Sequence, residues 1–154
     1  MRYRPTGFFL DGPIENSGLL YRTAAAVTIA KGDALHDNGS GLATNATTAL
    51  AATFLGIAAA DCASGGTVAI IPPLPDYRFW VCNGVAGTQL ATNDIGEIVD
   101  LEEVNTIDCT DNTLVGWGFK IDEIDISTEA LAGDGELVTA GGFAKGHFEI
   151  KGAA

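Results

Sequence analysis

Cysteine and histidine are scarce in this sequence. The three cysteines, Cys62, Cys82 and Cys109, are widely spaced and odd in number. This arrangement argues against a disulfide framework, and the lack of a Cys-x-x-Cys pair argues against a zinc site. His36 and His147 are the only histidines, the residue type that acts most often as a general base. We therefore expect reduced cysteines, no bound metal and no cofactor.

Long apolar runs are also missing. No stretch of about 18 apolar residues occurs, so the sequence predicts no membrane-spanning helix and no membrane partner. The segment MRYRPTGFFLDG carries two arginines, but Pro5, Gly7 and Asp11 interrupt its apolar residues. A secretory signal needs a longer apolar core, so we expect the protein to be made and kept in the cytoplasm.

Basic residues are few, and the acidic residues are unevenly placed. The chain has 8 lysines and arginines against 20 aspartates and glutamates, a formal net charge of -12. Residues 94–136 hold 13 of these acids and a single base, Lys120, while the remainder is balanced. Such a surface repels phosphates, so we expect no nucleic-acid partner. The acidic half is typical of a solvated face, or of a patch that matches a basic partner surface.

Aromatic residues make up only 8% of the chain, yet 47% of its residues are apolar and 20 are glycine. Small apolar residues, frequent turns and the lack of a helical stripe predict an all-β fold, a compact barrel or β-clip of short strands. Residues 54–60, 67–71, 79–82 and 146–151 are the clearest strands. Residues 119–126 change their inward parity, which predicts a β-bulge at Asp122 and Glu123.

The chain divides into four parts. Residues 1–17 form an extended N-terminal arm that packs on its own body or on a neighbour, and residues 18–71 form a first β subdomain. The proline-rich residues 72–77 remove three backbone donors and connect the halves. Residues 78–154 form a second, acidic β subdomain. No sequence repeat of useful length is visible.

The segment DALHDNGSGLATN, residues 33–45, crowds acids and amides around two glycines. An EF-hand loop that starts at Asp33 or at Asp37 lacks the glycine at position six and the glutamate at position twelve, so a hairpin corner at Asn38 and Gly39 is the better interpretation. Catalytic motifs such as Gly-x-Ser-x-Gly, HExxH and a phosphate-binding loop with lysine are also absent. We therefore predict no catalytic residues and no enzyme activity.

Two tryptophans and the arm are the candidate contact residues. Trp80 lies in a strand with apolar residues on both faces, and Trp117 stands between Gly116 and Gly118. An indole there either fills the core or contacts a partner, which could be protein or carbohydrate. The candidate interface residues are Tyr3, Arg4, Phe8, Phe9, Trp80 and Trp117.

A family resemblance covers residues 26–126. The segments VTIAKGDAL, GLAT and LGIAAADCASGGTVAII, followed by YRFWVCNG, LATNDIGEIVDL and GFKIDEIDI, resemble accessory capsid proteins of tailed bacteriophages. These decoration, or cement, proteins stud the outside of the mature head. The family has no chemical motif that can be carried over residue by residue.

The resemblance implies a small β-rich subunit, a homotrimer, that binds the major capsid protein and bridges neighbouring capsomers. It implies a place on the exterior of the virion after synthesis in the host cytoplasm. A phage head fibre or tail appendage that binds a carbohydrate or receptor is the alternative.

Overall fold

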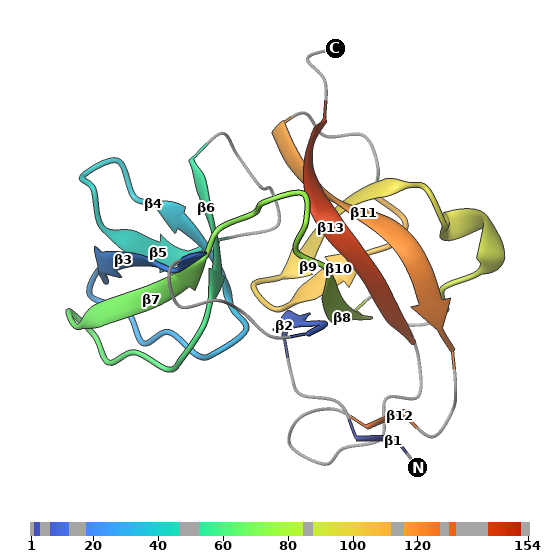
Figure 1. Ribbon diagram of the computed structural model, residues 1–154, viewed down its shortest axis with the longest axis horizontal. Helices are drawn as coiled ribbons and strands as arrows, with labels where there is room; N and C mark the ends of the chain where they lie inside the picture. The colour runs from blue at the N-terminus through green and yellow to red at the C-terminus, as the bar shows by residue number, and fades with distance from the viewer. Residues whose placement is uncertain are drawn as a thin grey trace.

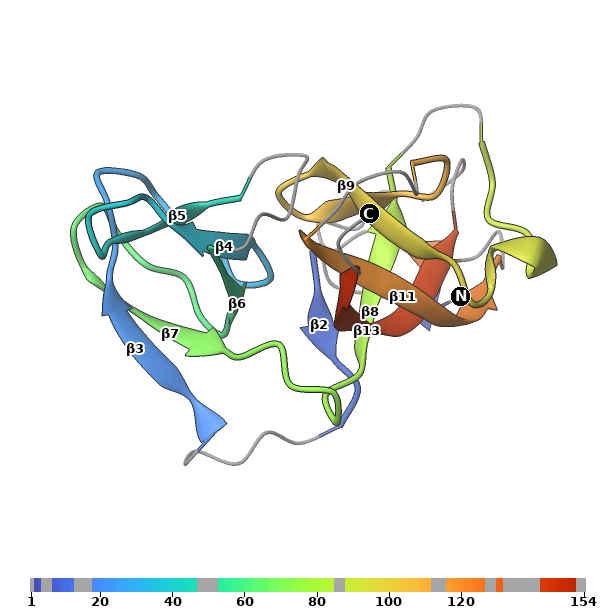
Figure 2. The same ribbon diagram turned by 90° about the horizontal axis from the view of Figure 1, so that it is seen from above.

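The computed structural model describes residues 2–3, 7–12, 18–46, 53–84, 88–111, 116–126, 130–131 and 142–151. These ranges contain strands and a 3-10 turn at Thr92–Asp94, so the all-β prediction is confirmed. Two groups of strands lie side by side (Figures 1 and 2). In the described part of the chain, no helix has the length and apolar character needed to cross a membrane.

Five strands form the first group, here called the first ring. Their order is β3-β7-β6-β4-β5, and all neighbours are antiparallel. A parallel bridge between Ala24 and Ala43 joins β3 back to β5, and the Ala25 N–H donates to the Ala43 carbonyl at 2.7 Å. The strands are β3 (Leu20–Thr23), β4 (Ala34–Asp37), β5 (Ala43–Asn45), β6 (Phe54–Ala58) and β7 (Thr67–Ile71).

The second ring closes in the same manner. Its order is β8-β13-β11-β9-β10, with antiparallel neighbours, and β10 returns to pair in parallel with β8. Strand β2 (Phe9–Leu10) adds to β8, while β1 (Arg2–Tyr3) and β12 (Ala130–Leu131) form a separate parallel pair. The ring strands are β8 (Phe79–Asn83), β9 (Ile98–Glu103), β10 (Thr106–Asp108), β11 (Gly116–Asp125) and β13 (Phe143–Lys151).

The two rings share one plan. Strands β3, β4, β5, β6 and β7 correspond in chain order to β8, β9, β10, β11 and β13, with the same neighbours and the same directions. The strand registers agree as well. Ala58 lies opposite Ile70 in the first ring, and Ile121 lies opposite Gly146 in the second. Ala58 is therefore equivalent to Ile121, and Ile70 is equivalent to Gly146. The parallel bridge between Ala24 and Ala43 corresponds to the pairing of β8 with β10.

Hydrogen bonds outside the strand ladders repeat in the same positions. The Gly32 N–H donates to the Ala58 carbonyl at 2.9 Å, and the Gly96 N–H donates to the Ile121 carbonyl at 2.7 Å. Both glycines have φ of +93°, a conformation that glycine adopts without strain. The chain therefore contains an internal structural duplication that the sequence analysis did not detect.

The rings meet through one apolar cluster. The apolar side chains inside the first ring form a small core cluster of their own. The apolar side chains inside the second ring belong to a larger cluster that also includes the outer face of β4, β6 and β7. Ala34, Ile57 and Ile71 are among the buried residues of that outer face. Phe54 in β6 places its ring 4.8 Å from that of Phe148 in β13. The first ring thereby covers one end of the second.

Two local predictions are confirmed. Strands β4 and β5 form an antiparallel hairpin around Asn38 and Gly39, and Gly39 has φ of +91°. The register of β11 against β13 shifts between Ile121 and Glu123, so Asp122 is the extra residue of a bulge. The bulge lets Phe119, Ile121 and Ile124 all contribute to the core, while Ile126 stays exposed.

Asp37 organises the hairpin corner. Its Oδ1 accepts from the N–H groups of Gly39 at 2.7 Å and Gly41 at 3.2 Å, and its Oδ2 lies 2.7 Å from Arg22 Nη1. The two backbone hydrogen bonds are the main cause that lowers the pKa of Asp37, and Arg22 lowers it further. The acids and amides of this loop therefore hold a sharp turn.

This geometry predicts a pH-dependent effect of Asp37→Asn. A carboxyl whose pKa is lower in the folded state stabilises the fold above its unfolded pKa, and the stabilisation is lost as pH falls through the folded pKa. We expect the variant to unfold at lower urea concentration than the wild type at pH 7. The difference should shrink below about pH 4, the unfolded pKa. A difference that stays constant from pH 7 to pH 2 would contradict this assignment.

Candidate interaction surface

Phe8 and Phe9 of the arm pack on the body of the chain. The Phe8 ring is 2% exposed and packs against Phe119 and Phe148, with centroid distances of 5.5 and 5.3 Å. Phe9 is half-buried in β2, opposite Trp80. Tyr3 lies in β1, and Arg4 lies outside the described residues. Phe8 is thus a core residue and presents no surface to a partner in this conformation.

The two tryptophans lie on different strands and do not form one site. Trp80 in β8 is half-buried and paired with Phe9. Trp117 in β11 is also half-buried and places its ring 5.8 Å from Phe54. Both interpretations of Trp117 therefore apply in part, because one side of the indole packs on the core and the rest reaches the surface.

Cys82 and Cys109 lie in environments that suppress the reactivity of their thiols. Burial raises the pKa of Cys82 to about 11, and its Sγ donates to the Asn83 carbonyl at 3.4 Å. Burial, followed by the nearby Asp94 carboxylate, also raises the pKa of Cys109. Because a thiolate is the nucleophilic form, both side chains are poor nucleophiles at neutral pH. No cluster of three or more metal-ligating side chains occurs among the described residues.

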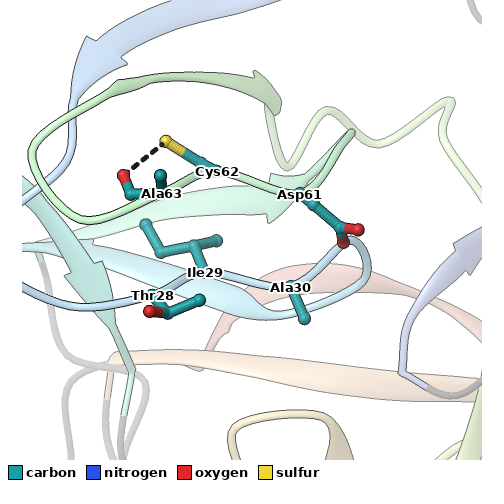
Figure 3. Close-up of a pocket in the computed structure, with 6 residues that line it drawn as sticks. All are labelled: Thr28, Ile29, Ala30, Asp61, Cys62 and Ala63. Atoms are coloured by element: carbon teal, nitrogen blue, oxygen red, sulfur yellow. Dashed lines mark hydrogen bonds between the residues drawn. The ribbon is translucent and has the colours of Figure 1, made fainter.

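A shallow hollow of about 350 Å³ lies on the first ring (Figure 3). The Cys62 thiol donates to the Ala63 carbonyl at 3.3 Å, and Asp61 Oδ1 accepts from the Lys31 N–H at 2.8 Å. Figure 3 shows the Asp61 carboxylate pointing away from the thiol. The acid and the thiol therefore form no joint reactive pair. The hollow is lined by Thr28, Ile29, Ala30, Asp61, Cys62 and Ala63.

An apolar surface lies where the connection between the rings passes the end of β11 and β13. It surrounds a hollow of about 310 Å³. Ile150 pairs with Trp117 across the two strands and is 66% exposed, and Leu74 is 47% exposed. We call this the seam surface, which comprises Pro73, Leu74, Pro75, Trp117 and Ile150. Of these residues, the sequence analysis named only Trp117 as a candidate.

Paired charges border the seam surface. His147 Nδ1 lies 2.8 Å from Asp122 Oδ2, and its Nε2 lies 3.1 Å from Glu149 Oε2. Arg78 Nε is 3.1 Å from the same Asp122 oxygen, and Lys120 Nζ is 3.5 Å from the same Glu149 oxygen. Half-exposed pairs of this kind contribute little to stability. They give the apolar surface a polar border in which acids and bases alternate.

No family model matches the chain, and no curated protein matches its sequence.

Proposed function

We propose that this protein is a structural capsid decoration protein, which binds the outer surface of a phage head and bridges neighbouring coat subunits. The seam surface is the observation that carries the proposal. Exposed apolar area with a polar border is the usual anatomy of a protein–protein interface. The sequence resemblance over residues 26–126 supports the same function. The proposed partners are the major capsid protein and two further copies of this chain, on the exterior of the virion.

Cementing of this kind requires area and no chemistry. A standard interface buries about 1,600 Å² in total. When many copies each span a joint between coat subunits, their contacts act together against the outward pressure of packed DNA. The formal net charge of -12 keeps a particle covered with such subunits soluble, and it repels free nucleic acid.

The proposal predicts that Ile150→Asp prevents decoration. Ile150 is 66% exposed, so the variant should fold normally. An unpaired charge in the middle of an apolar contact should weaken binding to undecorated heads at least about tenfold. Binding is measured by co-sedimentation over a range of protein concentrations, with electron microscopy of the heads.

Ile95→Asp is the matched control. Ile95 is 44% exposed and lies outside the seam surface, and the variant carries the same change in charge and size. It should bind heads as the wild type does. If Ile150→Asp occupies heads fully, or if both variants lose the same binding affinity, the seam surface is not the surface that binds the head.

A carbohydrate- or receptor-binding appendage is the second candidate. The observation that favours it is the hollow of the seam surface, where Trp117 lies beside the polar groups of His147 and Glu149. An aromatic face with adjacent hydrogen-bonding groups suits a sugar ring. A glycan array on which the wild type binds and Ile150→Asp does not, together with undecorated heads, would favour this candidate over the first.

A further inference from the structure

Among the described residues, comparison of the two rings shows one strand edge that is paired in the second ring and unpaired in the first. In the second ring, Phe9 and Leu10 of β2 pair with Trp80 and Phe79 of β8. Strand β8 corresponds to β3, which pairs along its length with β7 alone among the described residues. In Figure 2, the first part of β3 borders no labelled strand other than β7.

The register identifies the equivalent residues. Phe79 lies opposite Gly146 in β13, and Leu20 lies opposite Ile70 in β7. Because Ile70 and Gly146 are equivalent, Leu20 corresponds to Phe79 and Tyr21 corresponds to Trp80. The covered Phe79 is 0% exposed, whereas Leu20 is 47% and Tyr21 is 66% exposed.

The backbone at this edge is oriented to accept a strand. Alternate residues of an antiparallel strand direct their N–H and C=O groups to opposite sides. The Ala25 N–H donates to the Ala43 carbonyl of β5, on the side away from β7, so Tyr21 directs its groups to that side too. In the second ring, the Arg78 carbonyl on this side accepts from the Asp11 N–H at 2.8 Å. Leu19 is the residue of the first ring that corresponds to Arg78.

The part of this edge at Leu20 and Tyr21 carries no proline, lysine or bulge. Exposed edges are commonly blocked by proline, lysine or a bulge. Leu20 and Tyr21 are apolar or aromatic, and β3 pairs with β7 in continuous register. Arg22 is the only charged residue of β3, and its guanidinium binds Asp37 at 2.7 Å.

We infer that the edge of β3 at Leu20 and Tyr21 binds an extended segment of a partner protein, which adds as an antiparallel strand. The template is the segment Phe8–Phe9–Leu10, so the segment that binds should carry an aromatic residue between two apolar residues. The apolar residues would cover Leu20, and the aromatic residue would lie against Tyr21. This is strand addition, in which backbone hydrogen bonds supply affinity and alternate side chains supply specificity.

The residue equivalent to Lys145 decides whether the bound segment needs an acid after its apolar residues. Lys145 Nζ lies 2.7 Å from Asp11 Oδ2, which fixes the acid that follows β2. Lys145 lies opposite Trp80, and its equivalent opposite Tyr21 is Ala69. The edge of the first ring therefore places no requirement for an acid after the apolar residues.

The donor follows from the use of β2 within the chain. Each copy already pairs its own β2 with its own β8, so a second copy could donate this segment only by opening its own edge. We therefore assign the donor as the coat protein, a step that rests on the proposed function. The added strand would tie the first ring to one coat subunit.

The peptide GFFLDG, which is residues 7–12 with blocked ends, is the probe for the edge itself. Added to the labelled full chain, it should shift the amide resonances of residues 19–22 and slow hydrogen exchange at Tyr21 about tenfold. A peptide with aspartate in place of the residue-9 phenylalanine should bind at least about tenfold more weakly. Shifts confined to β8, or no shifts at all, would overturn the inference.

Two substitutions locate the binding. Tyr21→Pro removes an N–H that faces the open edge and leaves the bonds to β7 in place, a position where strands tolerate proline. It should abolish peptide binding, whereas Tyr21→Thr retains the N–H and should lose only part of the affinity. Leu20→Asp is a second blocking variant that keeps every backbone donor. Peptide binding that survives both Tyr21→Pro and Leu20→Asp would contradict the assignment.

The same variants separate this inference from the proposed function. If Tyr21→Pro decorates heads as fully as the wild type while Ile150→Asp does not, the decoration function stands and the coat donor is wrong. If the peptide binds at β3 but neither the wild type nor any variant binds heads, strand addition at β3 is supported and the decoration function is wrong. A dimer in sedimentation that Tyr21→Pro dissociates would make a second copy the donor and overturn this part of the inference.

Discussion

Replacing Phe148 by alanine is expected to lower the free energy of unfolding by about 3–5 kcal/mol. The ring is 2% exposed and lies at the centre of the aromatic cluster. Its centroid is 4.8 Å from Phe54, 5.3 Å from both Phe8 and Phe119, and 5.5 Å from Phe79. The truncation leaves a cavity that three strands and the arm cannot close without shifting the backbone.

Ile150→Ala is the matched control on the same strand. Ile150 is two residues further along β13 and 66% exposed, so its truncation should change stability by less than about 0.5 kcal/mol. Urea unfolding followed by fluorescence and by circular dichroism measures both variants. Equal small losses for Phe148→Ala and Ile150→Ala would mean that the aromatic cluster does not hold the two rings together.

The Phe148 contact with Phe54 tests whether the rings unfold as one unit. Phe54 belongs to β6 of the first ring, and Phe148 to β13 of the second. Further links cross the junction: the Ala34 N–H donates to the Val104 carbonyl, and the Phe8 N–H donates to the Gly32 carbonyl, both at 2.9 Å. With one continuous core cluster between them, we expect a single cooperative transition by both probes. A mechanical force applied to a partner bound at either ring would then be resisted by the whole folded chain.

The sequence predicted the strands where local signals were strong. Residues 67–71 form an apolar run that lies between a Ser-Gly-Gly turn and two prolines. The Asn38-Gly39 corner and the bulge at Asp122 each depend on a few neighbouring residues. The closure of each ring depends instead on pairing between distant strands, such as Thr106 with Cys82. No periodicity along the chain encodes which strands meet, so ring closure could not be predicted.

The duplication was hidden because equivalent residues face different surroundings. Ile57 and Ile71 on the outer face of the first ring are buried against the second ring. Their equivalents by register are Lys120 and His147, which form the charged border of the seam surface. One strand plan therefore carries an apolar pattern in one ring and a polar pattern in the other, and sequence comparison between the halves fails.

The candidate surface was only partly predictable for a similar reason. Phe8 was chosen as an apolar residue of the arm, and Trp117 as an indole between two glycines. Phe8 instead fills the core, and Trp117 is half-covered by Phe54. The exposed Leu74 stands between Pro73 and Pro75, a context that excludes a central strand and could have marked it. Tyr21 has no such signal, because only the comparison of β3 with β8 shows that its edge is open.

The second large effect is expected for Gly146→Ala. A Cβ at Gly146 would clash with the Lys120 carbonyl and would meet Phe119 Cε1 at 3.0 Å, so the backbones of β11 and β13 would have to separate. Overpacking of this kind should cost about 3 kcal/mol, near the upper end of its usual range. Gly65→Ala is the control, because Gly65 has φ of +74° but open space around its Cβ position. That variant should lose only about 1 kcal/mol through backbone strain.

The reason for this glycine lies in the duplication. A Cβ at Gly56 of the first ring would meet Ile70 Cγ2 at 3.0 Å. By register, Gly56 is equivalent to Phe119, and Ile70 is equivalent to Gly146. Each ring thus pairs one glycine with one large side chain, contributed from opposite strands. If thermal unfolding shows Gly146→Ala to be no less stable than Gly65→Ala, the close approach of β11 and β13, and this reciprocal packing with it, would be wrong.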